Sequence, residues 1–270
     1  MPAARIALWG MSLAGVALLA VSLLTEPPPL WLAVVALLAY MLFATSGVII
    51  PQLEMYGDVV WRGTSGVALT FDDGPDPENT RRVLRILAER GHKATFFVVG
   101  RKVKLHADVL REIHAAGHAI GLHGYLHDRL FSLKTPRFVC QDIERTQRAV
   151  EEACGMRPTL FRPPVGHVSS RTATGASMAG VTLVAWSVRA FDGLARPSPE
   201  RVVRRISRGL KPGAMVLLHD AAEHGDHVPG SVEALPKILD LIEQRGLKTL
   251  RASMNSWKTK AGRQSLGQER

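Results

Sequence analysis

The sequence contains only two cysteines among its 270 residues, and it has no internal repeat and no low-complexity tract. Cys140 and Cys154 bracket a segment with helical apolar spacing. In one helix, a rise of about 1.5 Å per residue would place these two residues roughly 20 Å apart. Since a disulfide requires Cα atoms within about 7 Å, we predict neither a disulfide nor a cysteine metal site.

Acidic residues are fewer than basic ones: the sequence has 24 Asp and Glu and 34 Lys and Arg, which gives a formal net charge of +10. A strongly basic chain invites a nucleic-acid interpretation. The basic residues are scattered, however, and their densest groups fall on predicted exposed helix faces or in the C-terminal tail: Arg201, Arg204, Arg205 and Arg208, then Lys258, Lys260 and Arg263. We therefore expect no nucleic-acid partner. A basic surface of this kind suits anionic lipid head groups or an acidic envelope polymer.

Charge is absent from two long runs near the N-terminus, residues 6–24 and 30–50. Each has about the 20 residues that a helix needs to cross roughly 30 Å of hydrocarbon. Residues 25–29 between them read Thr-Glu-Pro-Pro-Pro, which breaks a helix, and Pro51 ends the second run. This pattern predicts a transmembrane helical hairpin with both chain ends on one side of a bilayer. Two alternatives stay open: a cleaved signal peptide, although no small-x-small cleavage site follows the first run, and a buried soluble helix pair.

From Gly66 onward, short apolar runs alternate with amphipathic stretches. That alternation is typical of successive β-α units around a parallel sheet. Seven strands are expected, at residues 67–71, 94–99, 119–122, 159–161, 182–188, 215–218 and 248–250. We therefore predict an α/β fold, a distorted seven-stranded (β/α) barrel. The predicted layout is a hairpin at residues 1–50, a connector at 51–65, a barrel domain at 66–252 and a basic polar tail at 253–270.

Polar residues able to do acid–base or metal chemistry follow five of these predicted strands. They are Asp72 and Asp73 in the run Asp-Asp-Gly-Pro, the pair His123 and His127, Arg162, Asp192, and His219 followed by Asp220. In an (α/β) barrel the C-terminal ends of the strands form the active-site face. Each motif alone has a plainer interpretation, such as a polar turn, surface histidines, a structural ion pair or a strand cap. Their joint placement after five strands predicts a site.

Two imidazoles spaced i and i+4 fall on one face of a helical turn, so His123 and His127 with one Asp of the 72/73 pair predict a three-ligand metal site. A divalent ion there lowers the pKa of a bound water toward ~7 and polarises a carbonyl oxygen. Neighbouring Asp residues on an extended segment point to opposite sides, which leaves the second Asp free to act as a base. His219 is placed to protonate a leaving nitrogen. The assembly indicates hydrolysis of an amide or an ester.

Five ordered motifs carry a resemblance to a known family. They are Thr-Phe-Asp-Asp-Gly-Pro at residues 70–75, the spaced pair His123 and His127, Arg-Pro-Pro-Val-Gly at 162–166, Trp-Ser-Val at 186–188 with Asp192, and Leu-Leu-His-Asp at 217–220. Together they resemble the polysaccharide deacetylases (NodB-homology domain, carbohydrate esterase family 4) over roughly residues 60–250. The resemblance implies a distorted (β/α) barrel and a metal-dependent hydrolase that acts on carbon–nitrogen bonds.

The resemblance also implies a role for each motif residue. Asp72 would be the general base and His219 the general acid. The metal, most often Zn²⁺ and sometimes Co²⁺ or another divalent ion, would be bound by three residues: Asp73, His123 and His127. The supporting residues would be Arg162, which holds Asp72; Asp192, which orients His219; the backbone N–H of Val165, which stabilises the oxyanion; and Leu217, which lines the acyl pocket.

The sequence departs from the family pattern at four positions. Gly124 stands where many members have Ser or Thr, and Val165 stands where an aromatic residue is common. In the fourth motif Arg189 replaces an Asp and Gly193 replaces a Trp. No expected metal ligand, base or acid is lost, so hydrolysis remains the expectation. The acyl pocket is expected to be wider or differently walled.

The expected function is removal of an N-acyl group, most directly N-acetyl, from an amino sugar of an envelope polysaccharide such as peptidoglycan. This places the catalytic domain outside the cytoplasmic membrane, although Arg5 and a turn without Lys or Arg favour the opposite orientation. One alternative is a deacylase or deformylase of a lipid-linked sugar, which the hairpin would hold near the bilayer. A non-catalytic envelope-binding barrel and a metal-independent hydrolase of small cyclic amides are disfavoured, since the full Asp-His-His set is present.

Overall fold

The computed structural model describes residues 1–193, 197–223, 225 and 227–252. Its centre is a curled sheet of eight parallel strands in the order β1-β6-β5-β4-β3-β2-β8-β7. The strands are β1 (Val59–Val60), β2 (Val67–Asp72), β3 (Thr95–Val98), β4 (Ala119–Leu122), β5 (Leu160–Phe161), β6 (Thr182–Val184), β7 (Val188–Arg189) and β8 (Ala214–His219). The sheet confirms the predicted α/β class. The predicted tail at 253–270 lies outside the described residues.

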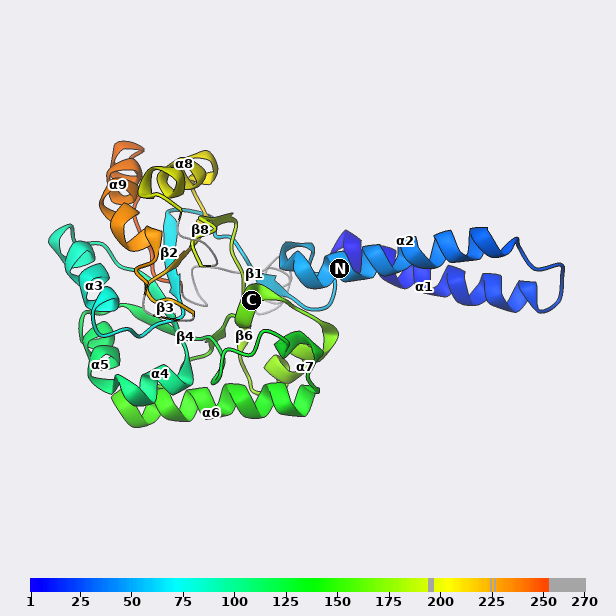
Figure 1. The fold of residues 1–270 in the computed structure, drawn as a ribbon, viewed down its shortest axis with the longest axis horizontal. Coiled ribbons are helices and arrows are strands. Elements are labelled where there is room, and N and C mark those ends of the chain that lie inside the picture. Colours follow the sequence, from blue (N-terminus) through cyan, green and yellow to red (C-terminus); the bar gives the residue numbers. More distant parts are fainter. Residues whose placement is uncertain (194–196, 224, 226, 253–270) are drawn as a thin grey trace, which may run out of the picture.

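Helices surround the outer face of the sheet (Figure 1). They are α3 (Asn79–Glu89), α4 (Gly100–Leu105), α5 (Ala107–Ala115), α6 (Pro136–Cys154), α7 (Ser170–Met178), α8 (Pro199–Gly209) and α9 (Gly230–Gln244). Their apolar faces cover the strands, and β2 is buried along its whole length. Parallel strands covered on both faces read as continuous apolar runs, which is why the pattern of the sequence reveals them.

Helix α6 shows how local signals set an element's bounds. The Thr135 side chain accepts a hydrogen bond from the backbone N–H of Phe138, and Pro136 occupies the first turn. Gly155 ends the helix in the left-handed conformation, at φ 72°. These are the cap, first-turn proline and terminal glycine that favour a single helix here. Cys140 and Cys154 are both free, as predicted, because they lie at the two ends of this one helix.

The strand count differs from the seven expected. Residues 182–188 do not form one strand: Leu183 in β6 pairs with Val59, whereas Val188 in β7 pairs with Val216 on the other side of the sheet. Apart from Thr182 and Ser187 the run is apolar and buried, so its hydrophobicity cannot reveal the change of partner. Strand β1 lies inside the predicted connector, and residues 248–250 contribute only a single bridge, from Thr249 to Val67.

Two further helices, α1 (Ala3–Ser22) and α2 (Leu30–Ile49), form a hairpin that projects away from the sheet (Figure 1). Each has 20 residues and is apolar enough to cross a membrane, by length and composition. No residue of α1 is buried, and in α2 only Gly47 is buried. A hairpin that exposes this much apolar surface is unlike the buried helix pair of a soluble core. The two helices fit membrane spans or a signal sequence.

The base of the hairpin is fixed to the rest of the chain. The Arg5 guanidinium donates to the Glu54 carbonyl at 2.9 Å and pairs with Asp58 at 2.9 Å. The Tyr56 hydroxyl donates to the Ala44 carbonyl at 2.9 Å. The first turn of α1 and the last turns of α2 therefore meet the same segment, which includes the 3₁₀ turn η1 (Pro51–Leu53).

Candidate functional site

The C-terminal ends of the parallel strands bring the predicted residues to one face. In the register of β2 with β8, Asp72 is the partner of His219. A cavity of about 310 Å³ opens there. Seven of the residues predicted from sequence line it: Asp72, Asp73, His123, His127, Val165, Leu217 and His219. The other two, Arg162 and Asp192, lie behind the wall and contact lining residues, so the structure brings the whole predicted set together.

Asp73, His123 and His127 form the one cluster of three or more His, Cys, Asp or Glu suited to a metal ion within the described part of the chain. The Oδ1 atom of Asp73 lies 3.2 Å from His127 Nε2 and 3.5 Å from His123 Nε2. That oxygen is buried and has no hydrogen-bond partner. A buried, unpartnered carboxylate oxygen is costly, and a cation is the partner that its surroundings would accept. The three residues fit a divalent ion.

The histidines present the correct nitrogen atoms to such an ion. His123 Nδ1 donates to the Arg162 carbonyl at 2.7 Å, because a carbonyl can only accept, and its Nε2 is the nitrogen that faces Asp73. Burial, reinforced by the neighbouring His123, lowers the pKa of His127 to about 4. His127 is therefore neutral at pH 7, as a metal ligand must be.

The prediction that the two histidines share a helical turn is wrong. His123 follows β4 directly, and His127 lies in the irregular loop beyond it. Gly124 and His127 both have left-handed backbone angles, at φ 78° and 56°. The loop bends back so that the two imidazole centroids lie 4.9 Å apart. The spacing of four residues gave the correct pair for the wrong structural reason, because a loop can also bring such positions together.

Asp72 is held by a buried guanidinium. Arg162 Nη1 donates to Asp72 Oδ1 at 2.6 Å and to Thr70 Oγ1 at 2.8 Å, and its Nη2 donates to the Ala185 carbonyl at 2.9 Å. Arg162 is fully buried, and burial lowers its pKa although the charge of Asp72 opposes the shift. A buried ion pair with further hydrogen bonds fixes both the charge and the direction of the carboxylate.

His219 is held by Asp192 on the opposite side of the cavity. His219 Nδ1 lies 3.0 Å from Asp192 Oδ1, and the Ser231 hydroxyl donates to Asp192 Oδ2. Burial alone would lower the pKa of His219, but the charge and hydrogen bond of Asp192 outweigh it and raise the pKa to about 10. The imidazolium is thus the stable form at neutral pH. Its Nε2 atom lies 4.0 Å from Asp73 Oδ2, on the cavity side.

Four residues that line the cavity hold strained backbone conformations. They are the non-glycine residues with positive φ, namely Asp73 (75°), His127 (56°), Val165 (61°) and Phe191 (58°). Such conformations cost about 1–3 kcal/mol each and persist where the surrounding structure enforces them. The residue after Val165, Gly166, also has positive φ, at 77°, and a Cβ there would collide with the Trp186 ring.

Two departures from the family pattern have a structural account. A Cβ at Gly193 would lie 2.7 Å from His219 Nε2, so the glycine leaves the imidazole edge open to the cavity. At Gly124, positive φ disfavours a side chain, and an added Cβ would lie 3.2 Å from both Asp142 Oδ1 and Pro164 Cγ. Asp142 accepts a hydrogen bond from the backbone N–H of the next residue, Tyr125, at 2.7 Å.

Sequence reasoning missed two supporting residues. Glu223 Oε1 lies 3.2 Å from His127 Nδ1 without hydrogen-bond alignment, and the same carboxylate accepts two 2.6 Å bonds from Arg129. Ser231 bridges Asp192 and the His219 backbone. Glu223 follows the fifth motif by three residues, but no spacing rule marks it. Ser231 begins a helix at a distance in sequence, so no local signal could have found it.

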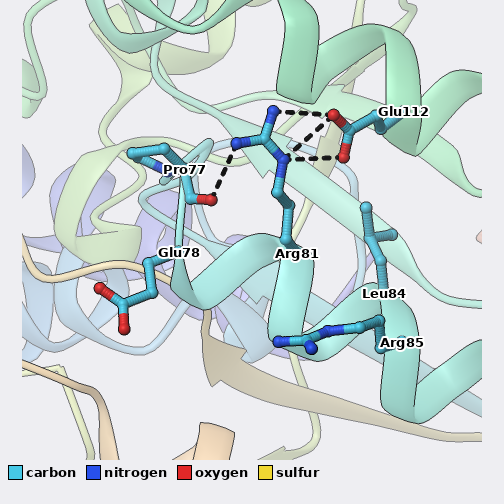
Figure 2. Close-up of a pocket in the computed structure, with 6 residues that line it drawn as sticks. All are labelled: Pro77, Glu78, Arg81, Leu84, Arg85 and Glu112. Atoms are coloured by element: carbon cyan, nitrogen blue, oxygen red, sulfur yellow. Dashed lines mark hydrogen bonds and ion pairs between the residues drawn. The ribbon is translucent and has the colours of Figure 1, made fainter.

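A second hollow, of about 430 Å³, lies away from this chemistry on the outer surface between α3 and α5 (Figure 2). Its most prominent side chain, Arg81, is engaged by Glu112 at 2.7 Å and by Asp108 at 2.6 Å. Arg81 also donates to the Pro77 carbonyl. The Arg81 guanidinium is therefore already paired with carboxylates.

Comparison with known proteins agrees with the geometry. The family profile described as polysaccharide deacetylase matches residues 62–184. A chitooligosaccharide deacetylase of Bradyrhizobium sp. is 35% identical over 202 residues, which cover 72% of this chain and 90% of the relative. A peptidoglycan-N-acetylglucosamine deacetylase of Bacillus cereus is 32% identical over 206 residues, which cover 75% of this chain and 94% of the relative.

Solved structures include both an enzyme and a protein without activity. The family 4 carbohydrate esterase of Streptomyces lividans, in complex with acetate, has 29% identity and a TM-score of 0.65, covering 73% of this chain and 97% of that one. A CE4 family pseudoenzyme of Bacillus anthracis has 27% identity and a TM-score of 0.64, covering 73% of this chain and 68% of that one. Likeness of fold alone therefore does not separate an active member from an inactive one.

Proposed function

Because the chain belongs to the polysaccharide deacetylase family, whose members are hydrolases of carbon–nitrogen bonds, we propose that it removes the N-acetyl group of an amino sugar. One observation carries the proposal. The unpartnered Oδ1 atom of Asp73 faces His123 and His127, with an arginine-held Asp72 on one side and a protonated His219 on the other. A retained fold without activity would not need every one of these groups.

The metal proposed for Asp73, His123 and His127 is zinc. Two imidazole nitrogens and one carboxylate oxygen form a ligand set that zinc accepts, and three protein ligands leave open positions for catalysis. Cobalt or another divalent ion suits the same donors. When bound, the ion supplies Lewis acidity toward the acyl carbonyl and acidifies a water molecule.

The chain's own residues would handle the protons. Asp72, paired with Arg162 and oriented by it, accepts a proton from the attacking water. The N–H of Val165 donates to the carbonyl oxygen as negative charge develops there. His219, protonated and aligned by Asp192, gives its proton to the amide nitrogen as the carbon–nitrogen bond breaks. The products are acetate and a free amino sugar, and Leu217 lies where the acyl group would sit.

We also propose that α1 and α2 are membrane spans rather than a removed signal peptide. The pairing of Arg5 with Asp58 and with the Glu54 carbonyl supports this, because a cleaved α1 would leave these groups without it. The catalytic domain would comprise residues 66–252, joined to the hairpin through the connector at 51–65. We place it outside the cytoplasmic membrane, where N-acetylated envelope glycans are found.

The test uses the full-length protein in detergent with zinc. Acetate release is measured from chitooligosaccharides and from peptidoglycan fragments, with and without a chelator. Asp72→Asn should abolish release, whereas Asp240→Asn, an exposed carboxylate on α9 that pairs with Arg90, should leave it unchanged. Zinc binding without release of acetate from any N-acetylated sugar would favour a non-catalytic protein. Absence of zinc binding would refute the site.

A further inference from the structure

Most charged groups around the cavity belong to pairs. Asp72 pairs with Arg162, Glu223 with Arg129 and Asp192 with His219, while Asp73 faces His123 and His127 in the proposed metal site. Arg189 also lines the cavity, at the end of β7. Among the described residues it forms no ion pair, so its charge is not neutralised.

Arg189 is held in place by aromatic rings instead of by a carboxylate. Its guanidinium carbon lies 3.6 Å from the centre of the Phe191 ring and 6.0 Å from that of Trp186, both of which line the cavity. Arg205 approaches the same Phe191 ring at 5.1 Å and donates to the Ala190 carbonyl at 2.8 Å. A stacked guanidinium keeps its N–H edge free, and that edge matches two oxygens of a phosphate.

The hairpin is attached directly to the wall of this cavity. Gln52, within η1, donates to the Trp186 carbonyl at 2.7 Å. The Val168 N–H donates to the Val48 carbonyl in the last turn of α2 at 3.0 Å, and the preceding residue, His167, lines the cavity. Helix α2 ends at Ile49 and η1 begins at Pro51, so no free linker separates the two parts. If α2 spans a bilayer, the wall lies at its surface.

Apolar side chains are exposed beside the opening. Val165 and Phe191 line the cavity and remain exposed, and Leu126 and Leu130 are exposed next to the lining residues His127 and Arg129. Apolar groups around a mouth suit contact with an interface where a lipid begins.

We propose that Arg189 forms an anion-binding subsite for the phosphate of an N-acetylated amino-sugar phosphate, which a membrane lipid presents at the bilayer surface. This inference rests on the proposed deacetylase function, since it names the substrate class of the same cavity. The shared chemistry is a sugar phosphate, and its source is either a lipid-linked sugar or a soluble one. The attachment of the hairpin favours the lipid-linked source.

Binding tests the subsite without turnover. Full-length Asp72→Asn protein in lipid nanodiscs is titrated with a long-chain isoprenyl N-acetylglucosaminyl phosphate and with a neutral N-acetylglucosaminide bearing the same chain. We expect the phosphate to bind roughly 10- to 100-fold more tightly, the range for a charge-assisted hydrogen bond. Adding Arg189→Gln should remove that preference. Arg201→Gln, which removes one exposed positive charge on α8, is the matched control and should keep it.

Equal binding of the charged and neutral lipids would overturn the subsite. So would a loss of the preference for the phosphate lipid in Arg201→Gln as large as the loss in Arg189→Gln. Acetate release by the metal-loaded protein with Asp72 restored separates the two claims. Release that does not depend on Arg189 refutes the subsite and leaves the deacetylase function standing. Binding that depends on Arg189 without release refutes the deacetylase function and leaves the subsite standing.

The source of the phosphate is decided by a second comparison, between the lipid-linked substrate in vesicles and soluble N-acetylglucosamine 1-phosphate. A flexible Gly-Ser segment inserted between Ile50 and Pro51 frees the cavity from the hairpin. We expect at least a tenfold loss in kcat/KM on the vesicle substrate and little change on the soluble one. Equal kcat/KM on both substrates, unaffected by the insertion, would overturn the membrane-held part of the proposal.

Discussion

The pairing of His219 with Asp192 gives the most direct prediction about catalysis. Asp192→Asn keeps the shape of the side chain and an oxygen that accepts from His219 Nδ1, but it removes the negative charge. Asp192 holds the pKa of His219 at about 10, against an ordinary value of 6.5. Without that charge, burial lowers the pKa of His219 and the charges of Asp73 and Asp72 raise it, with burial larger than either of them.

The size of the effect follows from the protonated fraction. In the unchanged protein His219 is almost fully protonated at pH 8. With a pKa of 6.5, roughly 3% would be protonated at pH 8 and about 75% at pH 6. If His219 is the general acid, kcat/KM for Asp192→Asn should fall about 30-fold at pH 8 and less than twofold at pH 6. If burial lowers the pKa of His219 below 6.5, the loss of kcat/KM begins at a correspondingly lower pH.

The assay is acetate release between pH 5.5 and pH 9.5. Ser231→Ala is the matched control, because it removes one hydrogen bond to Asp192 and leaves the carboxylate charged. We expect its profile to keep the shape of the original. A loss in Asp192→Asn that is the same at every pH would refute the acid role, since a purely structural defect does not follow the protonation of His219.

Stability and metal binding provide three further predictions. Arg162→Met should lower the free energy of unfolding by about 3–5 kcal/mol in urea titrations, because it leaves the Asp72 carboxylate buried without its cation, and a cost near zero would contradict the buried pair. The pKa of buried Asp220 is raised to about 7 from 3.8, so its stabilising contribution is present below about pH 4 and is lost as the pH rises through 7. Asp220→Asn keeps an oxygen that can accept from Thr80, so it should remove that pH dependence and stabilise the protein at pH 8 by up to about 4 kcal/mol. Chelation should lower the melting temperature of the zinc-loaded protein, and His127→Ala should weaken zinc binding at least tenfold; a melting temperature that does not respond to zinc would contradict the ligand set.

The sequence was sufficient to predict which strands carry the chemistry. Asp72, His123, Arg162 and His219 each follow an apolar run, and parallel strands deliver their C-terminal ends to one face. The order and spacing of the motifs were enough to identify the family. The same reasoning failed between residues 182 and 188, because a mostly apolar run does not indicate that its two halves pair with different strands.

The supporting contacts were decided by the tertiary structure. Glu223 beside His127 and Ser231 beside Asp192 carry no sequence signal, since each contacts a residue that is distant in the sequence. Gln52 and Trp186 are separated by 134 residues, and their contact joins the hairpin to the cavity wall. Local sequence determines the elements and the residues at their ends, because these depend on neighbours in the chain. How those elements pack in space decides which charges have ion-pair partners, and it leaves Arg189 without a carboxylate partner among the described residues.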